Sequence, residues 1–206
     1  MEQIKISYHG HACFMLESQD YRVVIDPYRH TMIPGLPELK LRCDAAYCSH
    51  GHEDHSYVSA LEICPGKAAD YSLEEFITPH DDVGGTLRGM NTVRIFRFGG
   101  LRIAHLGDIG DFPEDALLDA LKGVDCLLIP VGGYYTIDAA VAKKIVDAVK
   151  PRVCVPMHYR TDTSGFDVIA HLSDFTRQFE FVNYVDNAFV LTKDVPEQIL
   201  VINYKP

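Results

Sequence analysis

The feature that most constrains this chain is a run of six residues, His50-Gly51-His52-Glu53-Asp54-His55, which holds three imidazoles and two carboxylates. Residues 45–49, just before it, read as a short strand. Residues two apart on an extended chain point to the same side, so His50 and His52 can reach one ion if the strand geometry persists. The aspartate and the last histidine follow after the backbone has turned, where they can face a second ion. Because imidazole and carboxylate groups suit zinc, iron, manganese and nickel, the run predicts a metal site.

A histidine-rich surface loop or an expression tag is the alternative interpretation of this run. A tag lies at a terminus, whereas this run is internal and lies between a predicted strand and a predicted helix. Chance histidines do not usually recur at positions i, i+2 and i+5 with an aspartate between the last two. The spacing therefore favours metal binding.

The size and charge of the chain limit what else it can do. A length of 206 residues is enough for one domain with a complete core and short for two, so we predict a single domain over residues 1–206. The net charge of −10 implies an acidic surface that repels phosphate backbones, so nucleic acid is not an expected partner. No apolar run is long enough to span a bilayer, so no membrane partner is expected. The N-terminus lacks a signal-peptide pattern and the six cysteines form no CxxC pair, which favours a reduced, cytoplasmic protein.

Hydrophobic periodicity predicts an alternation of strands and helices. Strands are predicted over residues 4–8, 12–17, 21–25, 92–98, 101–106, 125–131, 152–156, 179–185, 188–192 and 198–203. Helices are predicted over residues 56–61, 113–121, 137–149 and 166–175, and loops over residues 28–44 and 81–91. Two packed sheets with helices outside would bury these strands on both faces.

Further histidines and aspartates follow apolar runs near predicted strand ends. The stretches are Pro79-His80-Asp81, His105-Leu106-Gly107-Asp108 and Pro156-Met157-His158. Chemistry in open sheets collects at strand ends, where loops converge. One such residue indicates little, but three of them together with the six-residue run predict one shared site.

These motifs resemble those of a known superfamily. The pattern His50-x-His52-x-Asp54-His55, followed by His80, Asp108 and His158, resembles the metallo-β-lactamase fold superfamily over nearly the whole chain. The stretches Tyr8-His9-Gly10-His11-Ala12, Ile25-Asp26-Pro27 and Arg88-Gly89-x-Asn91-Thr92 resemble its branch of uncharacterised metal-dependent hydrolases, which is related to ascorbate-phosphate lactonases. The resemblance implies an α/β fold of the αββα type, a four-layer sandwich with the metals at one edge between the sheets.

The resemblance also implies a set of ligands. By that mapping, His50, His52 and His80 hold the first ion, Asp54, His55 and His158 hold the second, and Asp108 bridges both. The expected cofactor is one or two divalent ions per chain, with zinc favoured and manganese, iron or nickel left open. Two ions about 3.5–4 Å apart can hold a hydroxide that attacks the substrate, which makes Asp54 and Asp108 the predicted catalytic carboxylates.

Other residues near these motifs each have two interpretations. The candidates for supporting or substrate contacts are His11, Asp26, His105, Tyr134, Tyr135, Tyr159 and Arg160. The first two either support the ligands or merely end a turn and a strand. The tyrosine pair at 134–135 either lines the substrate entrance or caps the next helix, and Arg160 holds an anionic substrate or pairs with surface carboxylates.

The first ion could take either of two histidines, His80 or His105. In the predicted strand, His105 shares a face with Leu101 and Ile103, and that face should pack inward. His80 lies between a proline and a glycine-rich loop, where it can reach outward. We therefore predict that His80 is the ligand and that His105 supports the site through hydrogen bonds.

The sequence as a whole predicts a metal-dependent hydrolase that uses a metal-bound hydroxide on a small, anionic lactone, ester or phosphoester. A phosphodiesterase or nuclease of the same fold is the enzymatic alternative, although nuclease members usually carry an added RNA-binding arm. A diiron oxidoreductase is disfavoured because such relatives favour a glutamate at the position of His52. A non-catalytic metal-binding protein is the alternative of another class, and homo-oligomerisation is left open.

Overall fold

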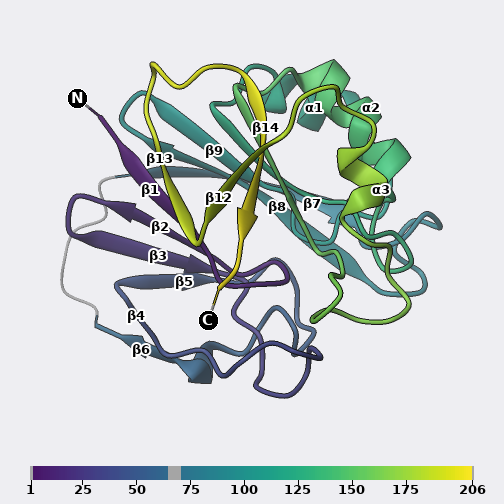
Figure 1. Cartoon of the computed structure of the whole chain (residues 1–206), viewed down its shortest axis with the longest axis horizontal. Coiled ribbons are helices and arrows are strands. Elements are labelled where there is room, and N and C mark those ends of the chain that lie inside the picture. Colours follow the sequence, from purple (N-terminus) through teal and green to yellow (C-terminus); the bar gives the residue numbers. More distant parts are fainter. Residues whose placement is uncertain (1, 65–70, 206) are drawn as a thin grey trace.

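Two β-sheets face each other in the structure, a computed structural model that describes residues 2–64 and 71–205 (Figure 1). The first sheet contains β1 (Ile4–Tyr8), β2 (Phe14–Ser18), β3 (Tyr21–Ile25), β5 (Ala45–Tyr47) and β13 (Ala188–Leu191), in the order β13-β1-β2-β3-β5. The second contains β7 (Ser72–Pro79), β8 (Met90–Phe98), β9 (Leu101–His105), β10 (Cys126–Pro130), β11 (Val153–Met157), β12 (Asn183–Asp186) and β14 (Gln198–Asn203). Its order is β12-β14-β11-β10-β9-β8-β7.

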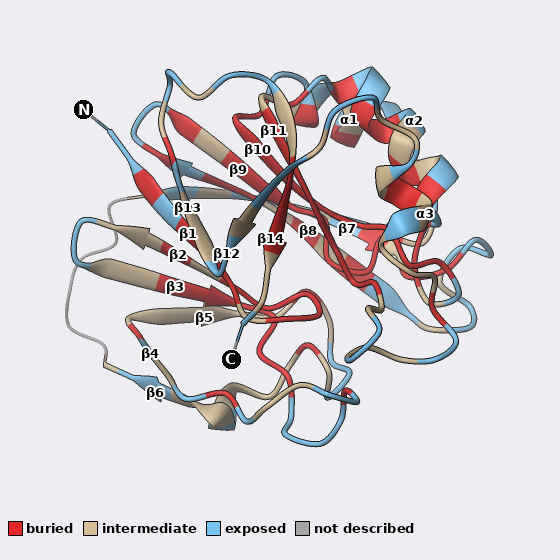
Figure 2. Ribbon diagram, viewed as in Figure 1, coloured by how far each residue is buried: buried red, intermediate tan, exposed pale blue. Residues whose placement is uncertain are grey.

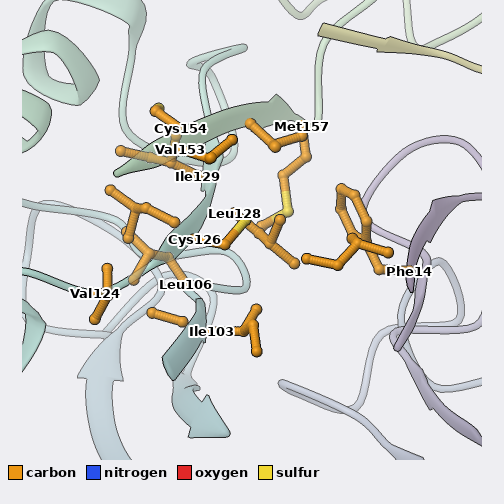
Figure 3. Close-up of a cluster of buried hydrophobic side chains, with 14 of the residues drawn as sticks. Phe14, Ile103, Leu106, Val124, Cys126, Leu128, Ile129, Val153, Cys154 and Met157 are labelled. Carbon is orange, nitrogen blue, oxygen red and sulfur yellow. The ribbon is translucent and has the colours of Figure 1, made fainter. Parts of the chain in front are cut away.

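The period-two alternation of the first sheet divides its side chains between two cores. Phe14 and Val23 belong to the main core between the sheets, whereas Val24 belongs to a smaller core on the outer face. Figure 3 shows Phe14 pointing toward Leu128 of the facing sheet. The strands β10 and β11 are buried at every position (Figure 2), as expected for parallel strands covered on both faces.

Three helices, α1 (Asp115–Leu121), α2 (Ala139–Val149) and α3 (Ser173–Thr176), lie beside the seven-stranded sheet (Figure 1). The helix α2 is capped at its N-terminus by Asp138, whose carboxylate accepts hydrogen bonds from the backbone N–H groups of Ala140 and Val141 at 2.9 and 2.8 Å. Its apolar stripe, which includes Ala142 and Ile145, is buried against the sheet. In the described part of the chain, no helix is long and apolar enough to cross a membrane.

The outer face of the five-stranded sheet is covered by irregular chain and a small sheet. Side chains from residues 28–39 pack there with a two-stranded sheet made of β4 (Leu41–Cys43) and β6 (Leu61–Ile63). The predicted α/β sandwich is therefore confirmed, with this layer built from loops and short strands. The strand β4 lies inside a segment predicted as a loop, because its partner β6 is distant in the sequence and gives no local signal.

Two predicted helices are wrong. At residues 56–61 the chain forms a short 3₁₀ turn, Val58–Ala60, and then enters β6. The first residue of this segment, Ser56, donates its hydroxyl to the carbonyl of His52 at 2.9 Å, so it does not cap a helix. At residues 166–175 only α3 is helical, because the backbone of Arg160 pairs with Ala170 and Leu172 and holds the earlier part of this segment in a bridge.

The topology brings the ends of several strands to one edge of the molecule. In the second sheet β9, β10 and β11 are parallel, and β7 runs the same way because both β7 and β9 are antiparallel to β8. In the first sheet β3 and β5 are parallel, and β1 shares their direction because both β1 and β3 are antiparallel to β2. The carboxyl ends of these strands carry the motif residues, so each sheet presents its motif residues along a single edge.

A matched pair of isoleucine substitutions tests the position of the main core. Ile129 is fully buried in β10, whereas Ile77 is 66% exposed on the edge strand β7. We expect Ile129→Ala to lower the free energy of unfolding by about 2–5 kcal/mol, because it removes buried methylene groups and leaves a cavity. Ile77→Ala should change it by less than about 1 kcal/mol. Denaturant-induced unfolding measures both, and equal losses would contradict the assigned core.

Candidate metal centre

The structure brings all seven predicted ligands together. The donor atoms of His50, His52 and His80 lie within 4.8 Å of one another and form a first cluster. A second cluster, within the same distance, contains Asp54, His55 and His158 together with His11. His11, which the sequence indicates only as a supporting residue, thus lies among the donors of the second cluster.

Asp108 lies between the two clusters. Its Oδ2 atom is 3.3 Å from His55 Nε2, 3.2 Å from His158 Nε2 and 3.5 Å from His80 Nε2. The side chain is 2% exposed and therefore faces the cluster and not solvent. One carboxylate is thus close to histidines of both clusters, which is the position that a bridging ligand requires.

Sharp turns at the strand ends direct several side chains into the site. His11, Asp26 and His158 adopt positive φ angles of 57°, 50° and 53°. This left-handed conformation is uncommon for residues other than glycine and often marks functional sites. The backbone N–H of His158 donates to the carbonyl of His11 at 2.8 Å, so the turns of the two sheets are bonded to each other.

The buried carboxylate of Asp26 fixes one of these histidines. Its oxygens accept hydrogen bonds from the backbone N–H of Ser49 at 2.6 Å, from the Ser49 hydroxyl at 2.6 Å and from His55 Nδ1 at 2.8 Å. Because Nδ1 of His55 is engaged by this carboxylate, Nε2 is the ring atom that points toward Asp108 and is left to bind an ion. Asp26 therefore sets the orientation and the tautomer of His55.

Asn91 and Gly107 position the backbone of Asp108. The Asp108 N–H donates to Asn91 Oδ1 at 2.9 Å, and Asn91 Nδ2 donates to Thr78 Oγ1 and to the carbonyl of Leu106, both at 2.9 Å. Gly107 has φ +54°, and a Cβ atom there would collide with the side chain of Asn91. Asn91 was not predicted as a site residue, although it stands in one of the family-like stretches.

The two histidines that compete for the first cluster have different surroundings. His105 is buried, its Nε2 is 2.9 Å from the carbonyl of Ala12, and its Nδ1 accepts the N–H of Gly107 at 3.1 Å. Both ring nitrogens of His105 are therefore used by the backbone. His80 instead points its ring toward His50, with ring centroids 4.5 Å apart.

Several buried polar atoms of the site lack a hydrogen-bond partner among the described residues. They are His50 Nε2, His55 Nε2, His80 Nδ1, Asp108 Oδ1 and both ring nitrogens of His158. Buried polar atoms in proteins are nearly always paired, since an unpaired one costs free energy. Divalent ions would satisfy such nitrogen and oxygen donors, so the residues present fit a metal centre.

The electrostatics of the site agree with this donor chemistry. Burial, followed by repulsion from neighbouring histidines, lowers the pKa of His50 to about 4 and that of His11 to about 3, so both rings are neutral at pH 7. Burial also acts to lower the pKa of His55, but attraction to Asp108 and Asp26 outweighs it and raises that pKa well above its ordinary value. The shift reflects the negative charge gathered around His55, which also favours binding of a cation at this point.

A pocket of about 450 Å³ opens onto both clusters. Its lining combines His52, Asp54, His80 and Asp108 with Met32, Gly51, Glu53, Arg88, Tyr135 and Phe166. Met32, Arg88 and Phe166 were not predicted from the sequence. Of these three, only Arg88 carried a signal, because it stands in the family-like stretch Arg88-Gly89-x-Asn91-Thr92.

The remaining candidates divide between the pocket and the rest of the fold. Tyr135 lines the pocket. Tyr134 is 63% exposed, and its ring packs against the ring of Tyr135 with centroids 4.7 Å apart. Tyr159 is buried beside Tyr8, with ring centroids 6.4 Å apart. Arg160 donates its Nε–H to the carbonyl of Ile169 at 2.9 Å and is not part of the pocket lining.

Comparison with known proteins places this geometry in a family. The β-lactamase superfamily domain matches residues 5–158. A UPF0173 metal-dependent hydrolase from Thermoplasma acidophilum is 30% identical over 200 residues, which cover 82% of this chain and 87% of that relative.

Solved structures agree with this match. A structure from Thermotoga maritima, described as a Zn-dependent hydrolase of the metallo-β-lactamase superfamily, superposes with a TM-score of 0.75 at 26% identity, covering 98% of this chain and 100% of that one. Igni18, a metallo hydrolase from Ignicoccus hospitalis, shares the fold with a TM-score of 0.68 at 22% identity, covering 92% of this chain and 99% of its own. The chain therefore belongs to the β-lactamase superfamily, in the branch that contains the UPF0173 metal-dependent hydrolases.

Proposed function

We propose that the chain is a metal-dependent hydrolase that cleaves a small anionic lactone, ester or phosphoester at a centre of two divalent ions. The observation that carries the proposal is the convergence of seven imidazole and carboxylate side chains, of which His52, Asp54, His80 and Asp108 line one pocket. The hydrolase names of the relatives support the same reaction class.

In this proposal the two clusters have separate roles. His50, His52 and His80 would hold one ion, Asp54, His55 and His158 would hold the other, and Asp108 would contact both. Imidazole and carboxylate donors favour zinc, and they also accept manganese, iron and nickel. Ions held here would lower the pKa of a coordinated water and polarise the carbonyl or phosphoryl group of the substrate.

The chain's own residues would orient the reactants and move the proton. Asp54 lines the pocket, and its Oδ2 lies 3.3 Å from His11 Nε2, so one carboxylate oxygen is held in place. Its other oxygen can accept a proton from the attacking water and return it to the leaving group, so that water and ester yield an acid and an alcohol. Tyr135 and Phe166 add aromatic walls to the pocket, which would limit the water around a bound substrate.

Metal analysis and turnover together test the proposal. We expect protein purified without chelator to carry one or two divalent ions per chain and to hydrolyse members of a panel of lactones, phosphodiesters and thioesters. The double variant His50→Ala/His52→Ala should lose the first ion, because it removes two of three histidine donors of that cluster. A control double variant, His30→Ala/His171→Ala, alters histidines outside both clusters and should keep the wild-type content. Equal metal in the two double variants would disprove the ligand assignment, and metal without turnover would indicate a binding protein.

Replacing the central carboxylate should weaken binding of the second ion and reduce turnover. Asp108→Asn keeps the size of the side chain but removes its charge, so we expect lower occupancy of the second ion and turnover reduced about 100-fold or more. Asp111→Asn, on the surface three residues further along, is the matched control and should retain wild-type metal occupancy and wild-type turnover. Elemental analysis and steady-state kinetics measure the two effects, and normal occupancy in Asp108→Asn would place the bridge elsewhere.

The support given by Asp26 can be tested without measuring turnover. Asp26→Asn would place an amide opposite His55 Nδ1, so the ring would lose the carboxylate that orients it. We expect metal affinity to fall about 10–100-fold, as for other residues that support metal ligands. Asp44→Asn is the control, because Asp44 also accepts a backbone N–H but lies outside the clusters. Competition with a chelator measures the affinity, and circular dichroism shows whether the fold is kept. An unchanged affinity would show that Asp26 does not control His55.

A further inference from the structure

We infer that Arg88 recognises an oxyanion on the substrate, so that the substrate carries a carboxylate or phosphate group beside the bond to be cleaved. This inference rests on the proposed function and assigns the residue that selects its substrate class. Arg88 lines the same pocket as His52, Asp54, His80 and Asp108. Among the described residues that line this pocket, Arg88 is the only lysine or arginine.

The charge of Arg88 is available to a ligand. Its guanidinium lies over the rings of Tyr134 and Tyr135, at 5.9 and 5.6 Å from their centroids, and makes no ion pair with a described residue. By contrast, Glu53 of the same pocket is already paired with Arg29 through two hydrogen bonds, of 3.0 and 2.8 Å. A guanidinium stacked on aromatic rings keeps its donors free and can bind a carboxylate or phosphate through two parallel hydrogen bonds.

The loop that carries Arg88 is held in place by the carboxylate of Asp81. Asp81 is 2% exposed and follows the predicted ligand His80 directly. Its oxygens accept backbone N–H groups from four residues of the loop, Val83, Gly85, Leu87 and Arg88, at 3.0, 2.7, 2.9 and 2.8 Å. The backbone of Arg88 is therefore fixed relative to His80 before a ligand arrives, which reduces the entropy cost of binding.

The rest of the pocket limits what the anion can be attached to. Met32, Tyr135 and Phe166 present apolar surface beside the metal donors, which fits a compact organic body. Because the chain carries a net charge of −10, an anion needs a local cationic group to enter, and Arg88 supplies one on the protein side. The sequence-based candidate for this role, Arg160, is bonded to the carbonyl of Ile169 and lies outside the lining.

A matched pair of chromogenic esters tests the inference. The monoester of glutaric acid with 4-nitrophenol carries a free carboxylate, and 4-nitrophenyl pentanoate has the same acyl length without it. We expect Arg88→Ala to raise KM for the glutarate ester about tenfold or more, with kcat nearly unchanged and the pentanoate ester unaffected. Arg88→Lys should recover part of the loss, because it restores the charge without the two-pronged geometry. The control is Arg97→Ala, whose side chain lies on β8 in an ion pair with Glu74 at 3.8 Å, outside the pocket lining.

Binding of glutarate itself, measured by titration calorimetry on metal-loaded protein, gives a readout that does not need turnover. Affinity should fall about tenfold or more in Arg88→Ala and stay unchanged in Arg97→Ala. Equal affinity of wild type and Arg88→Ala, or no glutarate binding to the wild type, would overturn the inference. The metal content of each variant keeps the two proposals separate. If Arg88→Ala binds the wild-type amount of metal but has lost affinity for glutarate, the loss is due to Arg88 alone. If the wild-type protein takes up no metal, the proposed metal centre is contradicted instead.

Discussion

The hydrogen bonds of the buried Asp26 carboxylate are the interaction on which the rest of the site depends. They join the end of β3 to Ser49, which precedes the histidine run, and to His55 within it. His55 in turn faces Asp108 from the other sheet at 3.3 Å. One carboxylate therefore holds the end of β3, the start of the histidine run and His55 together, and turns His55 toward Asp108 of the other sheet.

Such a concentration of buried polar groups lowers stability unless each group is compensated. Burial alone would raise the pKa of Asp108, but attraction to His158 and His55 lowers it well below the ordinary value. The site thus keeps its carboxylates ionised through neighbouring histidines, several of which retain unpaired nitrogens. The apolar core between the sheets, fully buried in β10 and β11, provides the stability that tolerates this arrangement.

The sequence predicts what local spacing encodes. The histidine run, the strand ends at His80 and His158 and the buried strands β10 and β11 were all predictable, because each depends on a few consecutive residues. The pocket was not, since Met32, Arg88 and Phe166 meet only in the folded chain. The predicted helix at residues 56–61 was wrong for a related reason, namely that the hydroxyl of Ser56 bonds to a carbonyl inside the histidine run.

The hydrogen bond from His158 to His11 joins two turns that lie near opposite ends of the sequence. A contact of such long range forms late, because the entropy of closing the intervening chain must be overcome first. During synthesis on the ribosome, the residues of the first cluster have all been made at His80, whereas the second lacks its final histidine until β11 is finished. The second cluster therefore cannot assemble before β11 has been made and has joined its sheet.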